Sequence, residues 1–304
     1  MLAYLFPGQG SQFVGMGADL ALSFPEAKAV FDEADDTLGF SLTSLMFGSA
    51  EDAEVRLTET EYTQPALYTH SLAAFAILEA RGQQPSVTAG HSLGEYSALA
   101  AAGAFSFADG LRVVRRRSEL MAQARAGTMV AVLGLEDAAV EQVCTDVSAA
   151  GDGVVVPANY NAPGQVVVSG DVAAVERAMD AFREASAKRV LPLSVSGAFH
   201  SPLMADAQAA FAATLDALDI QTPRCPVVLN VTAAPTTDPD EIRRRLIEQL
   251  TAPVRWSQSL TRIQDDGATR FVEVGSGKVL SGLVKRTLGR QADTAQAGTV
   301  DNFG

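Results

Sequence analysis

The sequence predicts an α/β fold in which a small α+β domain is inserted into a larger domain, and two patterns lead to this prediction. The first is a short apolar strand that passes through a glycine turn into a helix, and it occurs near the N-terminus, around residue 90 and near residue 275. The second is a β-α-β-β-α-β order between residues 127 and 195, which is the order of a ferredoxin-like unit. A chain of 304 residues that is 47% hydrophobic can bury the core that such a fold needs.

The elements of the larger domain follow from apolar runs and from the glycines that end them. The strand LAYLF leads through the loop FPGQGSQ, at 6–12, into a helix around 16–35. The later elements, in chain order, are a helix at 71–82 closed by Gly82, a strand at 85–90, an alanine-rich helix at 91–105, a strand at 225–232, a helical stretch at 240–265, and a final strand, glycine turn and helix at 269–289.

The inserted unit begins where the pattern changes, near residue 126. Its predicted elements are a strand at 127–135, a helix at 136–150, two strands around an Asn-Pro-Gly turn at 153–170, a helix at 171–187 and a strand at 187–195. We therefore expect a discontinuous larger domain at 1–126 and 196–290 and a ferredoxin-like small domain at 127–195. The remaining residues, 291–304, are small and polar, and we expect them to form a flexible tail.

The composition excludes several classes of function. A formal charge of −13 and a pI near 4.7 argue against binding to nucleic acid or to an anionic membrane surface, because both need a basic face. No apolar run approaches the roughly 18 residues of a membrane-spanning helix, and the first residues do not resemble a secretion signal, so we expect a cytoplasmic protein. Cys144 and Cys225 lack the spacing of a metal site or of a disulfide framework, and we expect no bound metal.

Gly90-His91-Ser92-Leu93-Gly94 fits the pattern G-x-S-x-G, in which a serine lies on a strained turn between a strand and a helix. Here a short strand comes directly before the pattern and an alanine-rich helix directly after it. This is the context that a nucleophile turn requires in an α/β-hydrolase-like domain. We predict that Ser92 is a nucleophile and that the larger domain is α/β-hydrolase-like.

A serine nucleophile needs a base, and the chain contains three histidines. His70 lies at the edge of an apolar helix, where we expect it to pack in the core. His91 adjoins the serine, and on so tight a turn its side chain should point away. His200 follows the last strand of the insert, where the chain crosses back to the larger domain and could present this histidine over Ser92.

One arginine lies in the apolar face of a predicted helix. On a helical wheel of residues 108–123, Arg117 falls between Val113 and Met121 in the apolar half. The other arginines of this helix fall outside that half: Arg112, Arg115 and Arg116. A buried guanidinium needs either an internal carboxylate or an anionic ligand, and the residues alone leave both open.

Seven stretches of the chain resemble one known family. They are FPGQGSQ (6–12), TQPALY (63–68), GHSLGEYSALAAAG (90–103), NAPGQVVVSG (161–170), GAFHSPLM (197–204), APVRW (252–256) and EVGSGKVLSGLVKR (273–286). In this order, and over nearly the whole chain, they look like the malonyl-CoA:acyl-carrier-protein transacylases. The acyltransferase domains of polyketide synthases belong to the same family.

The resemblance implies the catalytic residues. Ser92 matches the nucleophile, His200 matches the base, and Gln249 matches the residue whose backbone carbonyl orients that histidine. Gln9 and Leu93 match the two positions whose backbone N–H groups form the oxyanion hole. The glycines on either side of Gln9 would let its N–H approach a tetrahedral oxygen.

The resemblance also implies three residues that bind substrate. Arg117 matches the arginine that pairs with the malonyl carboxylate. Phe199 resembles the residue that malonyl-selective members have beside the base, where it would crowd a 2-methyl branch. We expect Met121 to contact the acyl group as well.

The implied reaction has two acyl transfers. Malonyl-CoA would acylate Ser92, and the phosphopantetheine thiol of an acyl carrier protein would take the malonyl group from that ester, for fatty-acid synthesis and without a bound cofactor. We expect a monomer.

The close alternative is a free-standing acyltransferase that serves a polyketide synthase in trans. The less favoured alternatives are an acyl hydrolase and a non-catalytic subunit that docks the carrier protein. Carrier proteins are usually acidic, so docking would need a local basic patch, for which the candidates are Arg115, Arg116, Lys285 and Arg286.

Overall fold

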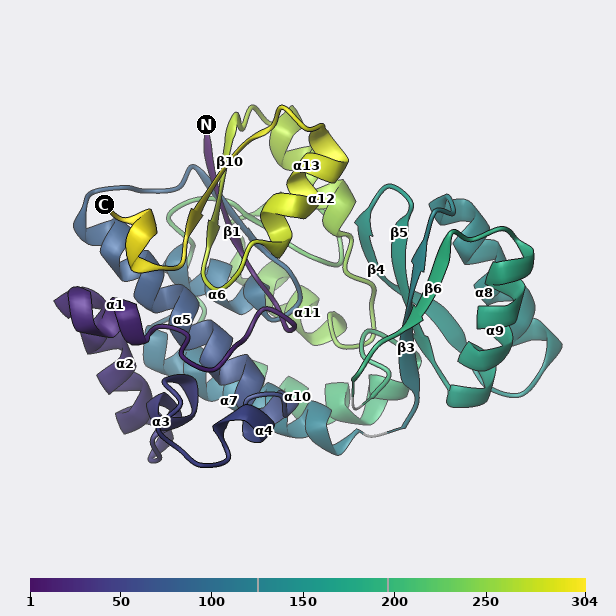
Figure 1. Cartoon of the computed structure of the whole chain (residues 1–304), viewed down its shortest axis with the longest axis horizontal. Coiled ribbons are helices and arrows are strands. Elements are labelled where there is room, and N and C mark those ends of the chain that lie inside the picture. Colours follow the sequence, from purple (N-terminus) through teal and green to yellow (C-terminus); the bar gives the residue numbers. More distant parts are fainter. Residues whose placement is uncertain (125, 196) are drawn as a thin grey trace.

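A computed structural model of the chain describes residues 1–124, 126–195 and 197–304. It contains a six-stranded and a four-stranded sheet, and Figure 1 shows that the middle of the chain forms the smaller one. The six-stranded sheet belongs to an α/β-hydrolase-like domain and the four-stranded sheet to an inserted ferredoxin-like domain, so the predicted fold class is confirmed. The second segment predicted for the larger domain begins at residue 196, which lies outside the described residues.

The larger sheet has the strand order β10-β9-β1-β2-β7-β8. Its neighbouring strands are parallel except for β7 and β8, which are antiparallel. The strands are β1 (Leu2–Phe6), β2 (Val87–Gly90), β7 (Val227–Val228), β8 (Pro235–Thr236), β9 (Arg270–Val274) and β10 (Asp293–Ala297). Phe6 pairs with Gly90 in the register of β1 and β2, so the glycine loop and the predicted nucleophile turn leave the sheet side by side.

Apolar side chains cover both faces of this sheet, as expected for parallel strands. Ala3 and Leu5 pack with α12 (Trp256–Asp265) and α13 (Val279–Leu288), whereas Tyr4 and Phe6 point into the core on the other face. The other helices of this domain are α1 (Ala18–Ser23), α2 (Pro25–Leu38), α3 (Leu42–Met46), α4 (Ala53–Arg56), α5 (Thr60–Ala80), α6 (Gly94–Ala101), α7 (Phe107–Gln123), α10 (Ala205–Asp216) and α11 (Pro239–Glu248).

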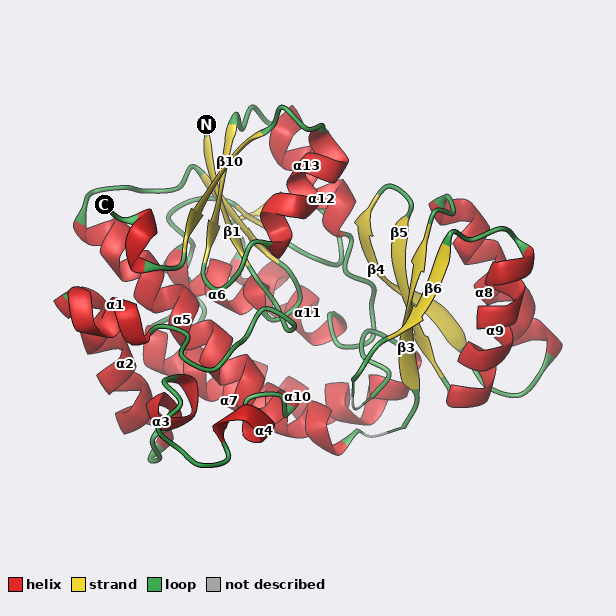
Figure 2. Cartoon of the chain, in the orientation of Figure 1, coloured by secondary structure: helices red, strands yellow, loops and turns green. Residues whose placement is uncertain are grey.

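The smaller sheet is antiparallel, with the strand order β4-β5-β3-β6. Its strands are β3 (Thr128–Leu133), β4 (Val155–Ala162), β5 (Gln165–Gly170) and β6 (Arg189–Pro192). Helices α8 (Asp137–Ala150) and α9 (Val172–Glu184) lie together on one side of it, as Figure 2 shows, and enclose a separate apolar core. The chain order of these elements is the β-α-β-β-α-β order predicted from the sequence.

Three of the predicted helices differ from their predicted bounds, and the stretch expected at 240–265 is two helices, α11 and α12. The helix expected at 16–35 is α1 followed by α2, because Phe24 is extended at φ −131° and Pro25 starts the second helix. The helix expected at 71–82 begins earlier, at Thr60, and accommodates Pro65.

Two short 3₁₀ helices are also present, η1 (Pro202–Met204) and η2 (Val300–Asn302). Within the described ranges, no helix combines the length and the hydropathy needed to cross a membrane.

The prediction of a flexible tail at 291–304 is wrong. Within it, β10 pairs in parallel with β9 and forms the edge of the larger sheet. Phe303 is 5% exposed, packs edge to face on Phe24 with 5.5 Å between ring centroids, and accepts a hydrogen bond from Arg81 at its carbonyl. The polar composition concealed this strand, because an edge strand is paired through backbone groups that most side chains permit.

Replacing Phe303 with alanine should lower the free energy of unfolding by about 3 to 5 kcal/mol, because a buried ring is lost. Urea denaturation followed by circular dichroism measures this change. Asp301→Ala, at an exposed position of the same segment, is the control and should change stability by less than about 0.5 kcal/mol. Equal stability of the two variants would mean that residues 291–304 have no fixed contacts.

Candidate active site

Ser92 lies on a strained turn at the carboxyl end of β2. Its φ is +53°, in the left-handed region that residues other than glycine rarely adopt. The turn needs its two glycines, because a Cβ at Gly94 would lie 2.0 Å from the carbonyl oxygen of Phe6 and one at Gly90 would lie 1.8 Å from the backbone of Gly94. The turn predicted from the G-x-S-x-G pattern is therefore present, and it places Ser92 at the edge of the sheet.

Asn230, which follows β7, holds this turn. Its side-chain oxygen accepts a hydrogen bond from the backbone N–H of Ser92 at 2.7 Å, and its side-chain nitrogen donates to the carbonyl of Gly90 at 2.7 Å. The Asn230 side chain is buried. These bonds satisfy backbone groups of the turn and stabilise the strained φ of Ser92.

His200 lies beside the Ser92 hydroxyl, with its Nε2 atom 2.8 Å from Oγ. Its Nδ1 atom lies 2.8 Å from the carbonyl oxygen of Gln249 and 3.2 Å from that of Ala252. Two acceptors at Nδ1 require the hydrogen there, so the Nε2 lone pair faces the serine. The crossing from β6 back to the larger domain thus brings His200 to Ser92, as predicted.

The ring of His200 is neutral near neutral pH. Burial and, after it, the charge of Arg117 lower the pKa of His200 to about 3, while the hydrogen bond to Gln249 acts in the opposite direction. A histidine whose folded pKa lies below its ordinary value takes up a proton only in acid. The Nε2 lone pair is therefore available over the physiological pH range.

Arg117 is fully buried, as the helical wheel predicted, and the structure places it beside Ser92. Its guanidinium lies 5.4 Å from the ring centroid of Tyr96. One terminal nitrogen donates to Ser92 Oγ at 3.3 Å and to the side-chain oxygen of Gln249 at 2.9 Å. The other donates to the side-chain oxygen of Gln64 at 2.6 Å. Because these acceptors are neutral, the permanent charge of the guanidinium can still pair with an anionic ligand.

The Gln249 side chain links Arg117 to a buried carboxyl group. Its nitrogen donates to the Glu95 carboxylate and, at 3.1 Å, to the backbone carbonyl of Ser92. Glu95 also accepts a hydrogen bond from the backbone N–H of Asn230 at 3.3 Å. Burial raises the pKa of Glu95 to about 7, against the effects of Gln249, Asn230 and Arg117, which favour its charged form.

The glycine loop after β1 lies against the turn that holds Ser92. Gly8 contacts the carbonyl oxygen of His91, which a Cβ would approach to 2.5 Å, and Gly10 adopts φ +99°. Within the described part of the chain, the backbone N–H groups of Gln9 and Leu93 donate to no other backbone or side-chain group. Both can therefore bind an oxygen of a ligand.

A cavity of about 130 Å³ lies over Ser92. Met121 on α7 and Phe199 beside the histidine contribute apolar side chains to its wall, and both are buried. The cavity thus combines a nucleophile and a base with an apolar lining, and Arg117 reaches the same hydroxyl from α7.

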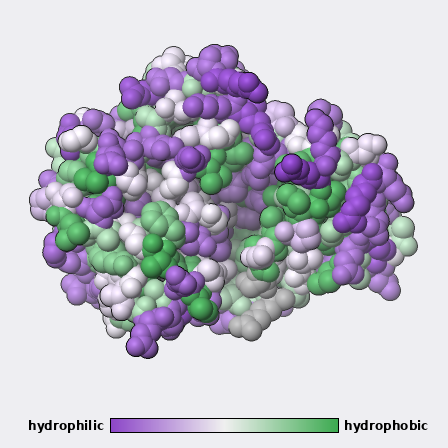
Figure 3. All heavy atoms as spheres, in the orientation of Figure 1, coloured by the Kyte–Doolittle hydropathy of each residue, from purple (hydrophilic) through white to green (hydrophobic). Residues whose placement is uncertain are grey.

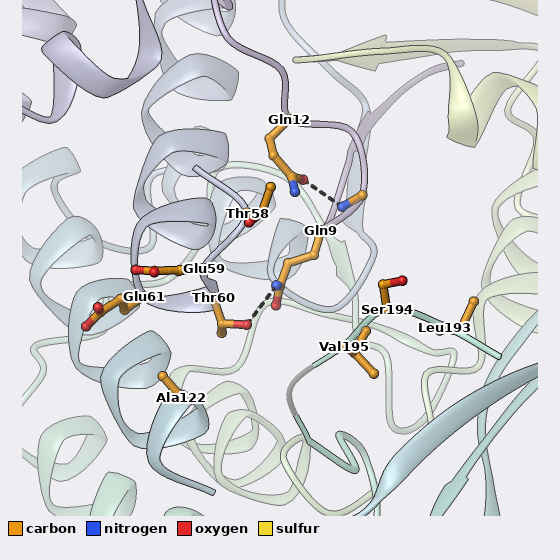
Figure 4. Close-up of a pocket in the computed structure, with 11 residues that line it drawn as sticks. Gln9, Gln12, Thr58, Glu59, Thr60, Glu61, Ala122, Leu193, Ser194 and Val195 are labelled. Carbon is orange, nitrogen blue, oxygen red and sulfur yellow. Dashed lines mark hydrogen bonds between the residues drawn. The ribbon is translucent and has the colours of Figure 1, made fainter. Parts of the chain in front are cut away.

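A larger cavity of about 940 Å³ adjoins the first, and the two share three lining residues: Gln9, Leu193 and Val195. Figure 4 shows the Gln9 side chain next to Thr60, to which it donates a hydrogen bond of 3.2 Å, and residues 193–195 across the opening. In the space-filling view the molecule is hollowed between its two domains (Figure 3). The site therefore lies where both domains contribute to the walls.

The two other histidines have environments apart from the serine hydroxyl. His91 lies 2.7 Å from the side-chain oxygen of Asn161 and packs edge to face on Trp256. His70 is buried in α5, and burial lowers its pKa to about 4. Across residues 1–124, 126–195 and 197–304, no group of three His, Cys, Asp or Glu side chains could hold a metal ion.

Sequence reasoning missed three residues of the site: Gln64, Glu95 and Asn230. Two of them have recognisable signals. Glu95 is a lone carboxylate in an alanine-rich buried helix, and Asn230 is a polar residue directly after a strand, at the sheet edge where ligands bind in α/β folds. Gln64 has no such signal, because a glutamine on a helix is commonly exposed.

Comparison with known proteins identifies the family. The acyl transferase domain model matches residues 3–302. The chain belongs to this family. The malonyl CoA-acyl carrier protein transacylase of Bacillus subtilis is 49% identical over 289 residues, which cover 94% of this chain and 90% of that relative. The resemblance inferred from the seven sequence stretches is thus confirmed.

Two further members of this family bear on the pathway. The polyketide biosynthesis protein ThaF of Burkholderia thailandensis is 44% identical over 298 residues, which cover 98% of this chain but 25% of that protein. A solved complex of a type II polyketide synthase acyl-carrier protein with its malonyl-transacylase superposes with a TM-score of 0.94 at 40% identity. The match covers 99% of this chain and 97% of the compared one.

Proposed function

We propose that this chain transfers the malonyl group from malonyl-CoA to the phosphopantetheine thiol of an acyl carrier protein, for use in fatty-acid synthesis. The observation on which this depends is the buried charge of Arg117, 3.3 Å from the Ser92 hydroxyl that contacts His200. A nucleophile with a base performs acyl transfer, and a cation beside it selects an acyl group with a carboxylate. The relative from Bacillus subtilis, named for the same reaction, supports the proposal.

In the first transfer, His200 Nε2 accepts the proton of Ser92, and the serine oxygen attacks the thioester carbon of malonyl-CoA. The negative charge that develops on the carbonyl oxygen is stabilised by the backbone N–H groups of Gln9 and Leu93. When the tetrahedral intermediate collapses, coenzyme A leaves as a thiol with the proton from His200. The malonyl group remains on Ser92 as an ester.

In the second transfer, the carrier protein's thiol gives its proton to His200 and attacks the ester carbon. Ser92 leaves and regains the proton, so the enzyme returns to its starting state. The backbone carbonyl of Gln249 keeps the histidine in the required tautomer throughout. We propose that no bound cofactor takes part, because these groups account for every proton and bond in both steps.

Three side chains select the acyl group in this proposal. The Arg117 guanidinium pairs with the malonyl carboxylate, whereas a neutral acyl group has no charge to pair with this guanidinium. Phe199 and Met121 line the cavity over Ser92 and leave little room for a branch beside the carbonyl. Malonyl is therefore favoured over both acetyl and methylmalonyl.

The alternative activities fit the site less well. A hydrolase for neutral acyl chains would leave Arg117 without an anion, and a non-catalytic docking subunit would not need a serine, a histidine and an arginine in contact. An acyltransferase acting in trans on a polyketide synthase would use the same chemistry. Sequence identity favours fatty-acid synthesis, because it is 49% to the Bacillus transacylase, against 44% to the polyketide protein and 40% to the malonyl-transacylase of the type II polyketide synthase.

We propose that the carrier protein docks on a basic groove of about 510 Å³, which residues of both domains line. Exposed Lys188 and Arg189 of the small domain and exposed Arg286 of α13 lie in it, although the chain as a whole is acidic. The candidates on α7 are weaker, because Arg115 and Arg116 both pair with Glu119, at 2.7 and 3.6 Å.

The groove is close enough to the site for a pantetheine arm. Arg189 begins β6, and Leu193, just after that strand, lines the cavity over Ser92. Four residues of extended chain span about 13 Å. A thiol on a long flexible arm can bridge this distance while the carrier protein stays on the surface.

We further propose that the larger domain comprises residues 1–126 and 196–304 and the small domain residues 127–195, and that the protein is a monomer in the cytoplasm. The elements of the ferredoxin-like unit lie inside 127–195, and β10 adds the C-terminal segment to the larger domain. One chain supplies every proposed catalytic group, which supports a monomer. Cys144 and Cys225 are free, which fits a reducing compartment.

Incubation with malonyl-CoA alone should add one malonyl group to Ser92, because the first transfer needs no carrier protein. Peptide mass spectrometry locates the adduct. Ser92→Ala should give none, whereas Ser194→Ala, at an exposed serine of the adjoining cavity, should keep it. A malonyl group on another residue would refute the proposed nucleophile.

Arg117→Ala should lower kcat/KM for malonyl loading by roughly 30- to 1000-fold, on the order of 2 to 4 kcal/mol, because a charge-assisted pair is lost. Acetyl loading should not fall with it. Competition between malonyl-CoA and acetyl-CoA measures both rates, and Arg116→Ala, at the exposed neighbouring position, is the matched control. An equal loss for both donors would make Arg117 a structural residue only.

Reversing the charge of the groove with Arg189→Glu and Arg286→Glu together should lower kcat/KM for the carrier protein roughly tenfold or more at low salt. Self-acylation by malonyl-CoA and transfer to free pantetheine should not change, because neither involves a protein acceptor. Arg112→Glu, an exposed charge reversal on α7, is the control. Unchanged kinetics with the carrier protein would mean that the docking surface lies elsewhere on the molecule.

A further inference from the structure

Glu95 is a buried carboxyl group that takes no part in the mechanism proposed above. It lies in α6, three residues after Ser92, and is 0% exposed. One oxygen accepts from the Asn230 backbone at 3.3 Å and the other accepts from the Gln249 side chain. Two neutral donors do not compensate a buried negative charge by themselves, so the ionised form depends on a cation nearby.

The Gln249 amide joins that carboxyl to Arg117. Its oxygen accepts from the guanidinium at 2.9 Å, and its nitrogen donates to Glu95. An amide has a positive and a negative end, and here each end faces the opposite charge. This orientation suits an ionised Glu95 that balances Arg117 across the amide.

We propose that Glu95 is a positioning residue for malonyl selection: as an anion it balances Arg117 through Gln249 in the empty enzyme, and it takes up a proton when the malonyl carboxylate pairs with Arg117. This inference rests on the proposed function, because it requires an acyl group that has its own negative charge. Two carboxylates close to one buried cation repel each other, and proton uptake by Glu95 removes that repulsion.

The surroundings of Glu95 permit this exchange. Arg117 on α7 is the cation that acts on it, and burial holds the pKa of Glu95 at about 7, so either charge state is accessible near neutral pH. Burial also raises the pKa of the neighbouring Tyr96 phenol, which therefore stays neutral. The neutral groups around the network, from α6 and from the segments packed against it, are Tyr96, Asn230, His200 and Gln249.

Proton uptake can be measured directly, because acylation itself leaves the proton count unchanged. Ser92 loses one proton and the released coenzyme A thiol carries one away. Stoichiometric acylation of the unaltered enzyme by malonyl-CoA in weak buffer with an indicator dye, at about pH 8, should therefore take up close to one proton per site. Acetyl-CoA, which has no second charge, should give no uptake.

The pH dependence of selectivity is a second measurement. Above its folded pKa Glu95 is ionised and must be protonated for malonyl to bind, so the ratio of kcat/KM for malonyl to that for acetyl should fall by up to about tenfold per unit above about pH 7. Below that pH the ratio should be level. His200 serves both donors equally and cancels in the ratio.

Glu95→Gln should abolish this slope, because the amide keeps an acceptor for Gln249 but cannot ionise. Glu79→Gln, at an exposed carboxylate on α5, is the control and should keep the wild-type slope. Malonyl-enzyme that forms without proton uptake would overturn the role of Glu95 and leave the proposed function intact. Failure to form malonyl-enzyme at all would instead overturn the proposed function. The proton measurement uses the unaltered protein, so it decides the matter even if Glu95→Gln does not fold.

Discussion

The burial of a guanidinium beside the reactive hydroxyl is the constraint on which the rest of the site depends. Removing Arg117 from water costs free energy, which the structure offsets with the oxygens of Gln64 and Gln249, the face of Tyr96 and the carboxyl of Glu95. These groups come from α5, from α6 and from the segment after α11. Their mutual orientation is therefore set by one charge, which also faces the nucleophile.

The parallel sheet positions the other groups of the site beside the nucleophile. The glycine loop follows β1, Ser92 follows β2 and Asn230 follows β7, and these three strands are neighbours whose carboxyl ends share one edge. Asn230 and the two glycines stabilise the strained turn, and they can do so only where these strands lie side by side. The chain that returns from the small domain brings His200 to Ser92.

Much of this site could be predicted because several of its requirements are local. The turn at Ser92 needs glycines at fixed spacing, and the inward position of Arg117 follows from the apolar half of its helix. Resemblance to the family added the partners of these residues. The tail at 291–304 was predicted wrongly for a related reason: β10 is held by backbone pairing to β9, which leaves no apolar pattern in its own residues.

What the sequence by itself determined is therefore the fold class, most of the helices and strands, and the residues whose chemistry depends on a local turn or on one helix face. Only the tertiary structure decided that the Gln249 side chain joins Arg117 to Glu95. Arg117 and Gln249 are 132 positions apart in the chain. Local patterns report which side of an element is apolar, whereas the partner of a buried polar group depends on how distant elements pack, and that is a property of the folded chain alone.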